Sequence, residues 1–191
     1  MTVAVVLAWL LLAGEARAHD VVPGVGGFSG GLLHPLLVPA HVLALIALGL
    51  ALGQKKQRPN ADLTLFVVGL GVGIGLIVTA FSITTDLAVL AAAAAAGIAT
   101  AIGRPLPLAL SGSLAIIAGV AIAFDSVPQE ISMQTTFLAL VGTAVSASVV
   151  VGLVAEAARR LTRDWQRVGM RIVGSWIAAA GIMVLALRLA S

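Results

Sequence analysis

The chain has 191 residues, of which 60% are hydrophobic and only 10% are charged, and its formal net charge is +3. A soluble domain carries about 25% charged residues, so this supply of charge cannot cover a water-exposed surface. The composition therefore predicts an all-α fold, namely a polytopic transmembrane helical bundle. The lipid bilayer is then a partner of the chain, because it surrounds the helices. The absence of cysteine excludes disulfides and thiolate metal sites. The basic residues fall in short clusters between apolar runs, which argues against a nucleic-acid partner.

The first 18 residues have the pattern of a signal peptide. An apolar core at residues 3–13 is followed by Ala16-Arg17-Ala18, which fits the small-x-small cleavage pattern. Cleavage after this triplet leaves residues 19–31 as a short extracytoplasmic segment and residues 32–191 as a single transmembrane domain. The alternative is an uncleaved anchor, although about 11 apolar residues are short for a full span.

About six apolar segments follow the leader, and each is expected to cross the membrane. Most approach the ~20 residues that span the hydrocarbon core, whereas the third is short and must be covered by its neighbours. Proline-containing turns at Arg104-Pro105 and Val127-Pro128 separate the later segments. The expected spans are residues 32–52, 63–84, 87–102, 106–124, 136–157 and 168–189.

The predicted loops alternate in charge. The loops after the first, third and fifth spans are basic, whereas the other loops carry Asp86, Asp125 and Glu130 without Lys or Arg. The positive-inside rule then places the basic loops in the cytoplasm and both mature termini outside, in the inner membrane of a bacterium. The basic residues are Lys55, Lys56, Arg58, Arg104, Arg159, Arg160, Arg163 and Arg167.

Glycines in the second span predict close helix packing. Lipid tails are as apolar as leucine, so contacts between membrane helices need small residues that let the backbones approach. Gly69 with Gly73, and Gly71 with Gly75, each form a GxxxG pair. The same string resembles a phosphate-binding loop, but no Lys-Ser/Thr follows it and the segment lies in the membrane, so no nucleotide is expected.

Two of the three histidines stand at the mouth of the first span, beside Pro35 and Pro39. Ionisable residues in membrane segments are costly and point to function. In a regular helix His34 and His41 lie about 10.5 Å apart along the axis, too far to share one ion. Either each belongs to a separate site, or the backbone is irregular, which is tolerated where it lines a polar cavity. Pro35 fits the first turn of a helix, and Pro39 is expected to kink it further in.

A blander interpretation of the two histidines stays open beside the functional one. His34 would then cap the helix at the interface, and His41 would be a hydrogen-bonded packing residue of the bundle.

The stretch Gly27-Phe28-Ser29-Gly30-Gly31-Leu32-Leu33-His34-Pro35, with His41 after it, resembles the start of the HupE/UreJ family. This family comprises small polytopic membrane proteins associated with nickel-iron hydrogenase and urease systems, and is regarded as a group of nickel or cobalt permeases. Its first-span motif is similar to H-P-x-x-G-x-D-H. Here Val38 stands at the glycine position and Ala40 at the aspartate position.

The resemblance and the residue types together give a candidate metal path. Imidazole nitrogens suit Ni²⁺ and Co²⁺, and carboxylates outside the membrane attract cations. Family members usually carry a second histidine-rich motif in a later span, and no histidine follows His41 here. For the two later acids the alternative is a solvated loop. The candidate ligands are His19, Asp20, His34 and His41, and the candidate ion-attracting carboxylates are Asp125 and Glu130.

Two functions remain open from the sequence. The first is a permease for Ni²⁺ or Co²⁺ as cargo, without a prosthetic group. The second is a non-transporting accessory or assembly subunit for a metalloenzyme system, in hydrogenase or urease maturation. The protein partner expected beside the bilayer and the metal ion is either a second copy of the chain, in a homo-oligomer, or a metalloenzyme-maturation protein. An enzyme is not expected, since no Ser/Lys, Asp/Asp or HExxH arrangement stands in a predicted span. No Walker motif is present, so this chain does not drive transport by its own ATP hydrolysis.

Overall fold

The structure is a computed structural model that describes residues 26–55, 60–79, 85–128 and 132–190. Within these ranges the chain is helical and contains no strand. The predicted all-α fold is therefore confirmed, while the predicted leader, residues 1–18, lies outside the described residues. The helices are α2 (Gly27–Leu37), α3 (Pro39–Gly53), α4 (Asn60–Val78), α5 (Asp86–Ile102), α6 (Leu108–Asp125), α7 (Met133–Arg160) and α8 (Asp164–Ala190).

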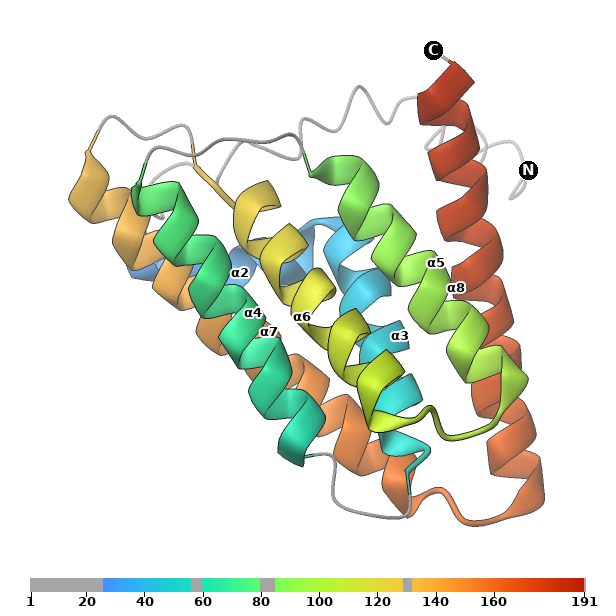
Figure 1. Cartoon of the computed structure of the whole chain (residues 1–191). Coiled ribbons are helices and arrows are strands. Elements are labelled where there is room, and N and C mark those ends of the chain that lie inside the picture. Colours follow the sequence, from blue (N-terminus) through green and yellow to red (C-terminus); the bar gives the residue numbers. More distant parts are fainter. Residues whose placement is uncertain (1–25, 56–59, 80–84, 129–131, 191) are drawn as a thin grey trace, which may run out of the picture.

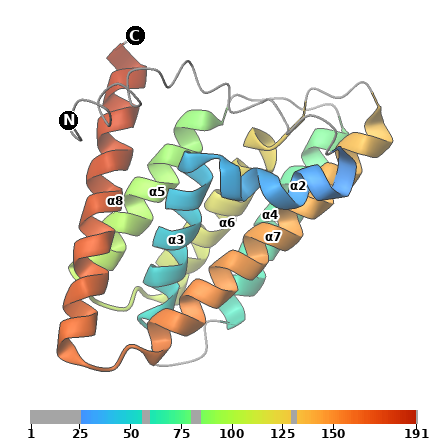
Figure 2. The same ribbon diagram turned by 180° about the vertical axis from the view of Figure 1, so that it is seen from behind.

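The helices form one bundle with α3 inside it. Figure 1 shows α4, α6, α5 and α8 side by side, with α3 and α7 behind them. From the other side, Figure 2 shows α2 lying across α7. α3 contacts α2, α5, α6, α7 and α8, and its side chains Leu45, Leu48 and Leu52 are at most 1% exposed.

Several helices are long and apolar enough to cross a membrane. Within the described residues these are α4, α6, α7 and α8, and the bent pair α2–α3 counts as a fifth if it is one span. α5 is apolar but has only 17 residues, in keeping with the short third segment expected from the sequence. The chain is thus a multi-pass membrane protein, and its exact number of spans stays a prediction.

The bundle has two ends that differ in charge. α3, α5 and α7 all finish at one end, where α4, α6 and α8 begin (Figure 1). Lys55, Arg104 and Arg163 follow the three helices that finish there, and we call this the lysine end. The opposite end, where α3 begins and α6 finishes, is called the histidine end, because it holds His41.

The first predicted span, residues 32–52, is not one regular helix. α2 and α3 meet at Val38 with a bend of 74°. Val38 is extended, with φ −87° and ψ 112°, because the ring of a following proline pushes a residue out of the helical region. Pro39 then begins α3, where its missing N–H costs nothing. The kink expected at Pro39 is therefore a full break, and Pro35, expected in a first turn, lies inside α2.

Glycines let α2 lie directly on α7. A Cβ added to Gly31 would collide with the backbone of Ala139, and one added to Gly142 would collide with the backbone of Phe28. This approach is closer than any larger residue permits. The hydroxyl of Thr143 also donates a hydrogen bond to the Gly31 carbonyl at 3.1 Å. The middle of α2 is thus held at a fixed place on α7.

The four glycines of α4 divide into two pairs with different surroundings. Gly69 and Gly73 face α6, where added Cβ atoms would meet its backbone and side chains within 3 Å. Gly71 and Gly75 have no atom within 4 Å of such a Cβ among the described residues. The packing role expected of all four is thus seen for the first pair only. The reason is geometric: positions two apart lie on different faces of an α-helix.

Candidate functional site

The site begins with His41, which lies in the first turn of α3 and is 0% exposed. Its Nε2 lies 2.8 Å from Oδ2 of Asp125, the last residue of α6. The side chain of Asp125 is only 13% exposed. Asp125 therefore does not stand in a solvated loop, which was the alternative left open by the sequence. Its carboxylate is a direct partner of a buried imidazole.

This hydrogen bond decides which nitrogen of His41 can bind an ion. An ionised carboxylate only accepts hydrogen bonds, so a neutral imidazole at this place carries its hydrogen on Nε2 and keeps the lone pair on Nδ1. Nδ1 is buried and has no hydrogen-bond partner among the described residues. Histidines that bind metals commonly donate their second nitrogen to a carboxylate in this way, which fixes the tautomer and the ring orientation. The contact with Asp125 thus orients the His41 ring in the way seen at such sites.

The break between α2 and α3 brings the second histidine to the same place. The ring centroids of His34 and His41 lie 5.2 Å apart, with an edge-on angle of 68°. Two imidazoles that share one ion can have centroids up to about 6.5 Å apart, given bonds near 2.1 Å. Of the two arrangements open from the sequence, separate sites or an irregular backbone, the structure has the irregular backbone. One shared ion is geometrically possible.

A small cavity of about 20 Å³ adjoins His34. Such a volume holds roughly one water molecule or a bare ion. The cavity lies between α2, α7 and the residues that follow α6, so small side chains and backbone form most of its wall. The lining residues are Gly26, Gly27, Gly30, Gly31, His34, Ser126, Pro128, Ala139 and Thr143.

The described residues do not form a complete metal site by themselves. Within residues 26–55, 60–79, 85–128 and 132–190, no group of three His, Cys, Asp or Glu side chains is placed to hold one ion. His19, Asp20 and Glu130, which the sequence proposed beside His34 and His41, lie outside the described residues. The site as described therefore offers two imidazoles and one orienting carboxylate.

The pairing of Asp125 with His41 was not predicted, although both residues were named as candidates. They are 84 residues apart, and the sequence assigned them separate tasks. The available signal was that each stands at the end of an apolar segment, where a polar group needs a partner.

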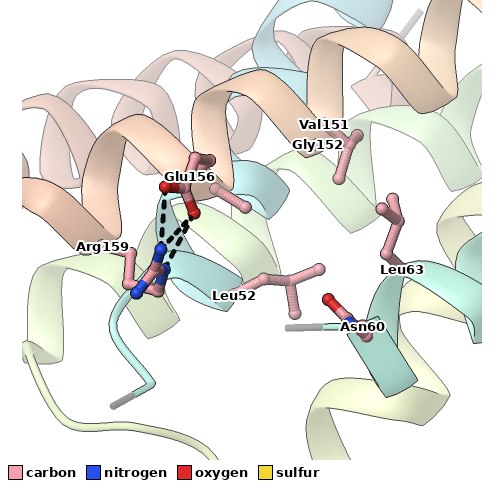
Figure 3. A pocket seen from close by; sticks show the side chains of 8 residues that line it. Leu52, Asn60, Leu63, Val151, Gly152, Glu156 and Arg159 are labelled. Carbon is pink, nitrogen blue, oxygen red and sulfur yellow. Dashed lines mark hydrogen bonds and ion pairs between the residues drawn. The ribbon is translucent and has the colours of Figure 1, made fainter. Parts of the chain in front are cut away.

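A larger cavity, of about 320 Å³, lies at the lysine end (Figure 3). Its carboxylate, Glu156, accepts hydrogen bonds from Arg159 at 2.8 Å and from Arg160 at 2.7 Å. The charge of this carboxylate is therefore already compensated, and no histidine lines the cavity. It suits a transition metal less well than the histidine end does. The lining residues are Leu52, Asn60, Leu63, Val151, Gly152, Ala155, Glu156 and Arg159.

Comparison with known proteins adds one finding. The sequence model of the family described as HupE / UreJ protein matches residues 7–184, nearly the whole chain. The resemblance drawn from the histidine motif is thus confirmed. No curated protein and no solved structure matches the chain.

Proposed function

The chain belongs to the HupE / UreJ family, and from this premise we propose that it is a nickel or cobalt permease of the bacterial inner membrane. The family is one of membrane accessory and permease proteins rather than of enzymes. The proposal makes the divalent ion the cargo and requires no prosthetic group. The histidine end faces the outside, with both mature termini there, and the lysine end faces the cytoplasm.

One observation carries this proposal: a buried histidine, oriented by a carboxylate, stands 5.2 Å from a second histidine at a broken membrane helix. Broken helices line ion sites in many transporters, because backbone at the break leaves the regular hydrogen-bond pattern. Neutral imidazole favours late first-row divalent ions such as Ni²⁺ and Co²⁺ over Mg²⁺ and Ca²⁺. The chemistry of the described residues thus fits the cargo that the family suggests.

The first span lacks the aspartate of the family motif, and the structure suggests what replaces it. Ala40 stands where the motif places an aspartate, next to His41. In this chain Asp125 of α6 brings a carboxylate to that histidine from another helix. The charge that the first span lacks is therefore supplied from a distance of 84 residues along the chain.

Uptake of radioactive nickel and cobalt tests the proposal. Cells express the wild type, His34→Gln, His41→Gln or Asp125→Asn at matched membrane levels. We expect both histidine variants to lose accumulation and Asp125→Asn to retain a reduced rate, because it removes the orienting charge but no ligand. Asp164→Asn, which changes an exposed carboxylate at the start of α8, is the matched control and should behave as the wild type.

Acidification of the medium sharpens the same assay. Protons compete with metal ions for the imidazole lone pair, so uptake by the wild type should fall as the pH is lowered. Equal accumulation in the wild type, the histidine variants and cells with an empty vector would contradict the permease. It would leave the accessory subunit of a metalloenzyme system as the better account.

A further inference from the structure

A second buried polar cluster lies at the lysine end, formed by Lys55, Asp62 and Ser111. Nζ of Lys55 donates hydrogen bonds to Oδ2 of Asp62 and to Oγ of Ser111, both at 2.6 Å. The Ser111 hydroxyl donates to Oδ1 of the same carboxylate at 2.6 Å. Asp62 is 2% exposed and Ser111 is 1% exposed. Each pair of groups is thus in contact, and the carboxylate is removed from water.

The cluster occupies a definite place relative to the histidine site. His41 lies in the first turn of α3, and Lys55 lies two residues beyond the end of that helix. On α6, Asp125 follows Ser111 by 14 residues, which corresponds to about 21 Å of helix. The two antiparallel helices therefore carry one polar cluster at each end, and the clusters are separated by most of the thickness of a hydrocarbon core.

The space between the clusters is closed by apolar side chains. On α3 these are Leu45, Leu48 and Leu52, and on α6 they include Ala115 and Ile122, all at most 1% exposed. An ion at the histidine end thus faces these apolar side chains of α3 and α6 before the Asp62 cluster. The large cavity of Figure 3 reaches Leu52, the last of these leucines, from the lysine end.

The chemistry of the second cluster is that of an occupied cation site. A buried carboxylate next to a hydroxyl offers oxygen ligands, which suit divalent ions. Here the positive charge is an ammonium of the same chain. Buried ion pairs contribute little net stability, so a purely structural role is a weak explanation for a charged pair that is buried here. Lysine has a flexible stem, and at 15% exposure this one keeps a route to the aqueous side.

We propose that Asp62 and Ser111 form a second divalent-cation site, which Lys55 occupies and keeps closed until an ion replaces its ammonium. The proposal rests on the proposed function, since the ion it receives is the cargo that leaves the histidine end. Lys55 is then a tethered competitor of the cargo. Removal of the lysine charge should expose a site that binds a divalent cation without any histidine.

Equilibrium dialysis of cobalt(II) chloride against the purified full-length protein in detergent tests this. All variants carry His41→Gln, which removes the histidine site from the measurement. We expect Lys55→Met to bind one additional Co²⁺ per chain, about tenfold or more tighter than the same protein with Lys55, a difference of about 1.4 kcal/mol. Addition of Asp62→Asn to Lys55→Met should abolish the gain, and addition of Ser111→Ala should weaken it.

Folding is controlled by the double variant Lys55→Met/Asp62→Asn, which leaves no uncompensated charge. If Lys55→Met unfolds in metal-free buffer, the site predicts that Co²⁺ restores its monodisperse elution. A Lys55→Met protein that binds no more Co²⁺ than its parent overturns the proposal, as does binding that survives Asp62→Asn, or a protein that Co²⁺ does not restore. Because His41 is absent throughout, these results are independent of whether the histidine site transports metal.

Discussion

The two ends of the α3–α6 pair solve the same electrostatic problem in different ways. At the histidine end, the carboxylate of Asp125 meets the imidazole of His41. At the lysine end, the carboxylate of Asp62 meets the ammonium of Lys55, and Ser111 donates a hydrogen bond to the other carboxylate oxygen. We propose that one carboxylate orients a ligand for an ion, whereas the other holds a cation supplied by the chain.

The two ends differ in whether a histidine lone pair is available to an ion. The histidine end has a lone pair on Nδ1 of His41 without a partner among the described residues. At the lysine end, the ammonium of Lys55 and the hydroxyl of Ser111 already contact the two oxygens of the Asp62 carboxylate. We infer from this asymmetry that an ion binds first at the histidine end.

The first prediction concerns which end of the bundle faces the outside of the cell. The native chain has no cysteine, so single cysteines report without background. Ser132→Cys, just before α7, should react with a membrane-impermeant maleimide in intact cells if the histidine end faces outside, as we propose. Thr162→Cys, just after α7, should react only after lysis. Labelling of Thr162→Cys in intact cells would invert the assignment.

Charge removal should affect the two ends unequally. Lys55→Ala leaves the Asp62 carboxylate buried without its cation, and we expect a loss of about 3–5 kcal/mol in the free energy of unfolding in metal-free buffer. Asp125→Ala leaves the His41 imidazole without one hydrogen bond, which should cost about 1–3 kcal/mol. Unfolding by sodium dodecyl sulfate in mixed micelles measures both.

Two controls sharpen this contrast. Lys55→Ala/Asp62→Ala removes the whole ion pair and should be more stable than Lys55→Ala alone. Ser113→Ala removes only a bond within α6 and should change little. Equal losses for Lys55→Ala and Asp125→Ala would show that the two carboxylates are in equivalent environments.

Displacement of α2 should disturb the histidine end alone. Gly31→Val would push α2 away from the Ala139 backbone, and over-packing of this kind costs about 1–3 kcal/mol. Nickel uptake should fall by more than the loss of folded protein explains, because His34 moves away from His41. Gly71→Val, on the open face of α4, is the matched control and should leave both unchanged. Normal uptake by a folded Gly31→Val protein would remove His34 from the site.

The sequence predicted the parts of this molecule that composition and hydropathy determine. The helical class, the apolar segments and the short third helix follow from the need to satisfy backbone groups inside lipid. The sequence left two arrangements open at Pro39, and an irregular backbone was one of them. A proline shows that a backbone donor is missing, but it does not predict the 74° bend between α2 and α3. That angle depends on the fit of α2 against α7.

Contacts between distant segments could not be predicted in the same way. Asp125 and His41 meet only because α6 and α3 are antiparallel neighbours, which no local pattern encodes. The sequence places Lys55 in a predicted basic loop, and no local pattern indicates that it contacts Asp62. Both residues contact Ser111, which lies 49 residues after Asp62 and completes the cluster.

Metal binding at His41 is tested most directly by X-ray absorption spectroscopy of nickel bound to the purified protein. We expect imidazole scattering in the first coordination shell, with nitrogen near the ~2.0–2.1 Å typical of histidine ligands. This signal should disappear in His41→Gln while the protein stays folded. A shell of oxygen ligands alone in the wild type, or a spectrum unchanged by His41→Gln, would contradict the assignment of the histidine end as the metal site.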